Sequence, residues 1–116
     1  MSEVGSPWIE RRTERFTLRM LVGSDGLDPI DDNVDIEVEL VGDPERWGAT
    51  VYTLANLDSL MRRWEHSGEC GGGRYFCADH AVIVRELTPH GVVQVIEALL
   101  DADEFVSAME QLDQEP

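Results

Sequence analysis

Two histidines and two cysteines lie close together in the middle of the chain: His66, Cys70, Cys77 and His80. All four are zinc-ligand types, and a structural zinc ion takes four such ligands in a tetrahedron. Their spacing, H-x3-C-x6-C-x2-H, lacks the paired C-x2-C units of the common zinc modules. A zinc site and a disulfide between the two cysteines are therefore alternatives. The pattern favours two ordinary thiols, because Cys77 falls in an apolar segment where cysteine packs as a small hydrophobe.

Cys70 is also the first residue to consider as a nucleophile. A reactive thiolate needs a positive neighbour or a helix N-terminus to lower the pKa of the thiol. Cys70 instead follows Glu69 and the expected end of a helix, and both have the wrong sign. The sequence thus predicts no catalytic residue and no enzyme activity.

Two further segments resemble ligand-binding loops on first inspection. Gly71, Gly72 and Gly73 form a glycine run without the lysine of a phosphate-binding loop, and no helix is expected to begin after it. Aspartates are concentrated in residues 25–35, but an EF-hand counted from Asp31 would need glycine and glutamate where Ile36 and Gly42 stand. We therefore expect a flexible turn and a solvated loop, and no cofactor.

The charge of the chain is its strongest compositional signal. It has 116 residues with 24 acids against nine bases, all arginine, and a net charge of −15. Such a field repels nucleic acid and anionic membranes and attracts basic proteins. The acids either keep the protein soluble or form a docking surface for a basic protein partner, and we take the second interpretation as the leading functional hypothesis.

Alternation and helical spacing divide the chain into elements. Residues 34–40 alternate apolar and acidic side chains, which is typical of a strand with one buried face. Similar reasoning predicts the other strands at 16–20, 47–53, 74–77 and 81–85, and helices at 56–66, from Thr88–Pro89 onwards, and over 105–112. Asn56 is the expected N-cap of the first helix and Gly68 its C-terminal cap, with Asp101–Asp103 interrupting the second helix.

This order predicts an α+β fold, with an antiparallel sheet of about five strands and two to three helices packed on one face. We expect an N-terminal arm over residues 1–13, one domain over 14–113 and a C-terminal tail over 114–116. If the first two strands of that domain pair antiparallel, Arg15 and Arg19 should lie near Glu37 and Glu39.

The predicted contact residues belong to two places. Asp35, Glu37 and Glu39 form the polar face of the second strand, and Arg74 and Tyr75 lie at the tip of the expected hairpin after the glycine run. No apolar stretch reaches the roughly 20 residues of a membrane span, and the first residues lack the basic start of a secretory signal. We therefore expect a cytoplasmic protein. An open sheet edge would also allow a homodimer, because its unpaired backbone groups can pair with those of a second chain.

The run of residues 53–87, from the leucine-rich helix through the glycine turn to the apolar strand, resembles small bacterial proteins of uncharacterised function. That resemblance covers about a third of the chain and implies no activity or site residue. In size and acidity the chain is similar to the immunity proteins that neutralise bacterial toxins. This second resemblance implies an inhibitor that covers a basic partner.

Overall fold

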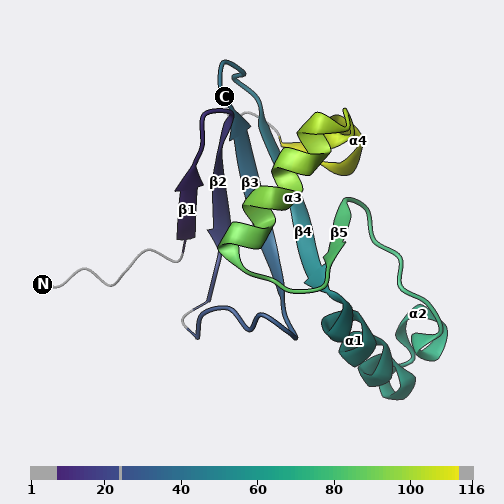
Figure 1. The fold of residues 1–116 in the computed structure, drawn as a ribbon. Coiled ribbons are helices and arrows are strands. Elements are labelled where there is room, and N and C mark those ends of the chain that lie inside the picture. Colours follow the sequence, from purple (N-terminus) through teal and green to yellow (C-terminus); the bar gives the residue numbers. More distant parts are fainter. Residues whose placement is uncertain (1–7, 24, 113–116) are drawn as a thin grey trace, which may run out of the picture.

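The computed structural model describes residues 8–23 and 25–112 as a mixed α+β fold (Figure 1). The elements in chain order are β1 (Trp8–Arg12), β2 (Phe16–Leu21), β3 (Asn33–Leu40), β4 (Arg46–Thr53), α1 (Leu54–Ser67), α2 (Glu69–Gly73), β5 (Ala81–Val84), α3 (Pro89–Asp101), α4 (Phe105–Ala108) and β6 (Glu110–Leu112). They form one sheet in the order β1-β2-β3-β4-β5, with β6 also paired to β4. The predicted α+β class is confirmed.

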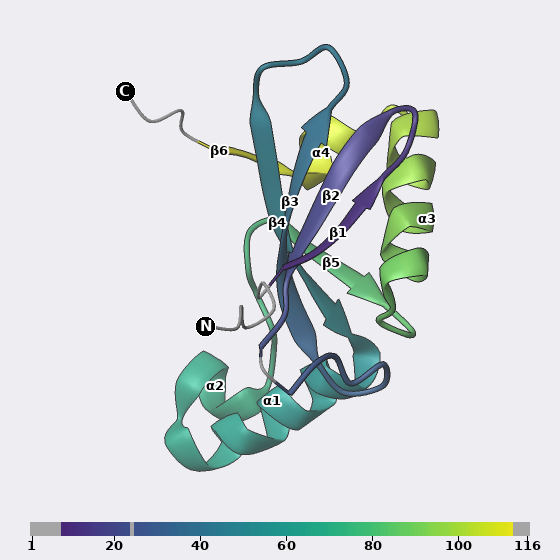
Figure 2. The same cartoon turned by 90° about the vertical axis from the view of Figure 1, so that its left-hand side faces the viewer.

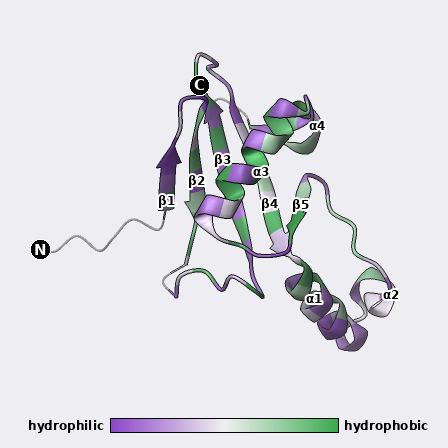
Figure 3. Ribbon diagram, in the orientation of Figure 1, coloured by the Kyte–Doolittle hydropathy of each residue, from purple (hydrophilic) through white to green (hydrophobic). Residues whose placement is uncertain are grey.

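Alternation along β2 and β3 separates the two faces of the sheet. The two strands pair antiparallel, so that Phe16 faces Leu40 and Leu18 faces Val38 on one side. Phe16, Leu18 and Val38 are completely buried, whereas the intervening polar residues reach solvent on the other side. The apolar side is the core face, and we call the opposite side the outer face. The alternating bands of Figure 3 follow this division.

Two short strands share the far edge of β4. Its second half pairs in parallel with β5, from Thr50 beside Ala81 to Thr53 beside Val84. Its first half pairs antiparallel with β6, with Gly48 beside Glu110. The β4–β5 pair is parallel because residues 74–80 run back from α2 along the sheet before β5 begins beside Thr50 (Figure 1). Every other pair is antiparallel.

The helices occupy two positions. α3 and α4 cover the core face, where Val92, Ile96 and Phe105 join the buried cluster and the Phe105 ring meets Trp47 edge-on at 5.7 Å between centroids. α1 and α2 instead project beyond the end of the sheet (Figure 2). Among the described residues, no helix lies across the middle of the outer face (Figure 2). None of the described helices has the length and apolar content needed to cross a bilayer.

Helix boundaries follow side-chain capping, with one difference from expectation. The N-cap of α1 is Thr53, whose Oγ1 accepts a hydrogen bond from the Asn56 backbone at 3.0 Å. Asn56 is instead a buried residue of the first turn: its amide donates to Asp31 and accepts from Asn33. The predicted caps at Gly68 and at Thr88–Pro89 are confirmed.

Three further expectations about local structure are wrong. Residues 8–12 of the predicted arm form the edge strand β1, while 1–7 and the predicted tail at 114–116 lie outside the described residues. Residues 74–77 have no strand conformation. The expected last helix ends at Ala108, because Met109 turns to extended backbone and residues 110–112 add β6 to the edge of β4 that β5 leaves unpaired.

Candidate partner-binding surface

The three acidic residues predicted for partner contact lie on the outer face, as their alternation indicated. In the register, Glu37 and Glu39 are opposite Arg19 and Thr17 of β2, and Asp35 is opposite Thr50 of β4. Polar and charged residues of neighbouring strands thus lie opposite one another on this face. The sequence correctly placed these side chains but did not show how far arginines neutralise them.

Arginines from neighbouring strands bridge most of the carboxylates at the β1 side of the face. Arg19 binds Glu39 at 2.9 Å and Glu10 at 3.2 Å, and Arg46 binds Glu37 at 3.2 Å. The hydrogen bond from Arg12 to Glu10, at 2.9 Å, lowers the pKa of that carboxyl group, and the hydrogen bond to Glu39 raises the pKa of Arg19. Glu37 and Glu39 are therefore compensated charges rather than a free acidic strip.

Arg15 does not take part in this network. Its guanidinium group instead binds Glu97 at 2.7 Å and Asp101 at 2.9 Å, both on α3. These contacts raise the pKa of Arg15, with the hydrogen bond to Asp101 as the main cause. Arg15 thus ties the turn between β1 and β2 to the helix on the core face, whereas we expected it near Glu37 and Glu39.

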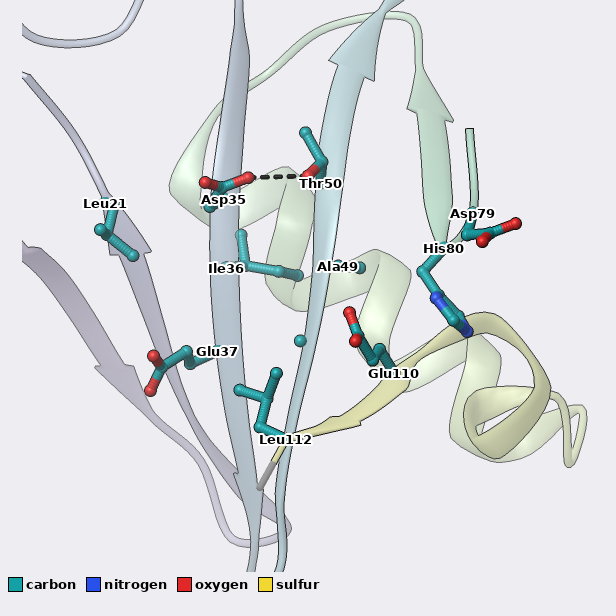
Figure 4. Close-up of a pocket in the computed structure, with 11 residues that line it drawn as sticks. Leu21, Asp35, Ile36, Glu37, Ala49, Thr50, Asp79, His80, Glu110 and Leu112 are labelled. Atoms are coloured by element: carbon teal, nitrogen blue, oxygen red, sulfur yellow. Dashed lines mark hydrogen bonds between the residues drawn. The ribbon is translucent and has the colours of Figure 1, made fainter. Parts of the chain in front are cut away.

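Uncompensated carboxylates gather at the other side of the outer face, around a shallow depression of about 350 Å³ (Figure 4). Asp35 on β3, Asp79 before β5 and Glu110 on β6 line it, and none of the three makes an ion pair among the described residues. Asp35 accepts a hydrogen bond from the Thr50 hydroxyl at 2.7 Å. Two strands and the turn before β5, far apart in sequence, thus place carboxylates around one depression, with the Asp79 carboxylate directed outward (Figure 4).

Apolar side chains form the remaining lining of this depression. Leu21 is 42% exposed on one side, and the Leu112 side chain packs against β4 at Gly48. A Cβ at Gly48 would lie 3.2 Å from the Leu112 methyl groups, so a side chain there would crowd them. His80, at a positive φ of 54°, lies across β4 from Asp35 and Glu37 (Figure 4). An apolar floor with an acidic rim can hold the aliphatic stem and the charged head of an arginine or lysine.

A second depression adjoins the first and has Glu37 in common with it. Its lining is the bridged network of Glu10, Arg19, Glu37, Glu39 and Arg46, together with Trp8. Trp8 is opposite Leu21 in the β1–β2 register. The outer face therefore changes along the sheet from a charge-balanced region to an acidic one. We call the acidic region, lined by Leu21, Asp35, Asp79, His80, Glu110 and Leu112, the acidic depression.

Arg74 and Tyr75 are not part of this depression. Arg74 is the C-cap of α2, and Tyr75 follows it with 55% of its side chain exposed. The expected hairpin tip does not exist, because Cys70–Gly73 form a turn with four successive positive φ angles and the chain then runs without a strand to β5. The structure therefore separates the predicted contact residues into two surfaces.

The histidines and cysteines of the alternative metal site are not brought together. Cys70 is half-buried and Cys77 exposed, and both are free thiols. In the described part of the chain, which includes all four residues, no group of three or more potential ligands is placed to hold an ion. The same statement covers the described aspartates of residues 25–35.

Those aspartates have local structural roles. Asp28 accepts hydrogen bonds from the backbone of Ile30 and Asp31, and Asp32 accepts one from the backbone of Asp28. Hydrogen bonds from Asn56 and then Ser59 lower the pKa of the Asp31 carboxyl group. The loop before β3 is thus joined to the start of α1, which sequence reasoning did not anticipate.

Comparisons with known proteins found no relative of the chain. No protein-family model, no curated protein and no solved structure matches the chain.

Proposed function

We propose that the protein is a binding module whose acidic depression receives a basic segment of a protein partner. The observation that supports this is the position of Asp35, Asp79 and Glu110, without arginine partners among the described residues, around one depression on an outer face that no described helix covers. Each of these carboxylates remains available for an incoming cation. The neighbouring carboxylates of Glu10, Glu37 and Glu39 are instead paired with Arg19 or Arg46.

Charge and shape favour a basic side chain as the occupant. A net charge of −15 steers cationic surfaces towards the molecule, and the unpaired carboxylates direct them to one place. Leu21 and Leu112 add apolar contact beside the acids. An arginine that enters can contact both the leucines and a carboxylate, which is a combination that binding hot spots favour.

An inhibitor of a basic enzyme is one form that this function can take. An enzyme that acts on a polyanion has a cationic substrate site, and an acidic face that covers the site competes with the substrate. In this form, the partner's substrate-binding arginines or lysines would lie against Asp35, Asp79 and Glu110. The partner would then lose activity when the complex forms.

Titration of the isotope-labelled chain with a hexa-arginine peptide, followed by NMR, tests the site. We expect the largest chemical-shift changes at the backbone around Asp35, Asp79 and Glu110. The variant with Asp35→Asn, Asp79→Asn and Glu110→Gln should bind the peptide at least about tenfold more weakly.

A matched control separates the site from the overall charge. Glu86, Asp103 and Glu104 are exposed and make no ion pair among the described residues. The variant Glu86→Gln, Asp103→Asn, Glu104→Gln changes the net charge equally and should bind like the parent. Equal weakening in both triple variants would show that the peptide senses only net charge, and the proposed site would be wrong.

A photoreactive amino acid at Leu21 extends the test to the natural partner. Crosslinking in cells should capture a protein whose contact peptide is rich in arginine or lysine. The same amino acid at Val106, exposed on α4, is the control position. A contact peptide without basic residues would contradict the proposal.

A further inference from the structure

Residues 54–78, which we call the arm, comprise α1, α2 and the segment that follows them. Its two helices project beyond the end of the sheet, and the segment after α2 runs back alongside the sheet (Figure 2). Asn56 is the one buried residue of α1. The apolar residues of its helical stripe, Leu57, Leu60, Met61 and Trp64, are half-buried rather than covered. A helix of 14 residues thus reaches solvent with its apolar stripe incompletely covered.

Aromatic residues are concentrated on this arm and at its base. Tyr52, at the end of β4, meets the Phe76 ring at 4.9 Å between centroids, and Phe76 stacks on Trp64 at 6.0 Å. None of these three rings belongs to the buried core of the domain. Tyr75, which precedes Phe76 in the chain, and Ile83, the register partner of Tyr52 on β5, are 55% and 41% exposed. We call the four aromatic residues Tyr52, Trp64, Tyr75 and Phe76, together with Ile83, the aromatic patch.

The arm also differs from the rest of the chain in charge. It carries three acids, Asp58, Glu65 and Glu69, and three arginines, Arg62, Arg63 and Arg74. The other 21 of the 24 acids, and six of the nine arginines, lie outside it. Aromatic residues and arginine are enriched in protein interfaces, and acids are depleted there. The arm therefore has interface composition on a molecule that is otherwise strongly acidic.

We propose that the aromatic patch and the arm bind a second copy of this chain, in a two-fold symmetric dimer. Two acidic bodies repel each other wherever their carboxylates meet, and a neutral arm that projects from the body lets them touch while the bodies stay apart. Arg62 is bridged to Asp58 on its own helix at 2.9 Å, but in a symmetric contact Arg63 and Arg74 of one arm can face Glu65 and Glu69 of the other. A basic partner would find no excess of negative charge here, unlike at the acidic depression.

Analytical ultracentrifugation of the full chain, with reductant present because both cysteines lie in the arm, tests this proposal. We expect a mass of twice the 13.0 kDa of one chain at high concentration, with reversible dissociation on dilution. The variant Tyr75→Glu, Ile83→Glu should raise the dimer Kd at least about tenfold. Both residues are exposed, so the change does not disturb the core.

The matched control replaces two other exposed apolar residues. Val41 and Val106, 68% and 67% exposed, lie outside the arm on the β3–β4 turn and on α4. Val41→Glu, Val106→Glu adds the same charge and should dimerise like the parent. A monomer at all concentrations, or an equal loss of dimer in both double variants, would overturn the proposal.

Hydrogen exchange on the unmodified chain provides a second measurement that does not depend on a variant folding correctly. Amides of residues 54–83 should become more protected at concentrations above the dimer Kd than below it. Protection that instead appears along Trp8–Arg12 would assign the dimer to the open edge of β1 and contradict the arm as the interface.

Discussion

Replacement of Gly73 by alanine should detach the glycine turn from α1. Gly73 has a φ of 83°, and a Cβ there would overlap the Met61 carbonyl oxygen and lie 3.3 Å from the Glu65 backbone nitrogen. Both contacts are to helix backbone, which cannot move aside as a flexible side chain would. The variant therefore combines a left-handed backbone cost of about 1–2 kcal/mol with an overpacking cost of about 1–3 kcal/mol.

Gly72→Ala is the matched control for this prediction. Its φ of 75° imposes the same backbone cost, but a Cβ there meets nothing within 4 Å. The difference between the two variants isolates the steric contact at about 1–3 kcal/mol, or roughly 5- to 150-fold in an opening equilibrium.

Hydrogen exchange is the appropriate assay because the arm contributes little to the core and can open locally. In Gly73→Ala, the amides of the second half of α1 should exchange faster than in Gly72→Ala by that factor. The amides of β2 and β3 should exchange alike in both variants. Equal exchange of α1 in the two variants would refute the close approach of Gly73 to Met61.

Three other outcomes follow from particular contacts. Asn56→Ala should lower the free energy of unfolding in urea by about 1–3 kcal/mol, since it breaks the bonds of a buried amide to Asp31 and Asn33, whereas Ser59→Ala, at an exposed hydroxyl, should cost less. Arg19→Gln should cost only about 0–1 kcal/mol at low salt, and the cost should shrink in high salt because its ion pairs are partly exposed. The pKa of Asp31 is lowered in the folded state, so its contribution to stability is present above the ordinary value of 3.8 and is lost as the pH falls through the lowered pKa. Asp31→Asn should therefore have a lower free energy of unfolding in urea than the parent at neutral pH, and the two values should converge in acid.

The parts of the fold that local pattern determines were predictable. Alternation along residues 34–40 placed Asp35, Glu37 and Glu39 on the outer face and paired the strand with β2, so that Arg19 met Glu39. Hydroxyl and glycine caps gave the start of α3 and the end of α1. These signals act over a few residues, where backbone hydrogen bonding and burial depend on immediate neighbours.

The arrangement that makes the acidic depression was not predictable in the same way. Asp79 and Glu110 line the same depression as Asp35, on the other side of β4, because β5 and β6 share one edge of β4. No local pattern reveals which edge is open. Residues 110–112 carry a helical apolar spacing that edge pairing overrides. Arg15 likewise finds its partners on α3, more than 80 residues away in the chain.

The uneven distribution of charge leads to opposite salt responses at the two proposed surfaces. Contact between a basic segment and Asp35, Asp79 and Glu110 gains from Coulomb attraction, so added salt should weaken it. Contact between two neutral arms gains only the weak attraction of exposed ion pairs and is opposed by the repulsion of two chains that each carry a net charge of −15, so the same salt should strengthen it. Measured between about 50 mM and about 500 mM salt, where the Debye length falls several-fold, the two Kd values should move in opposite directions. A shift in the same direction would mean that one surface, and not two, is responsible for both contacts.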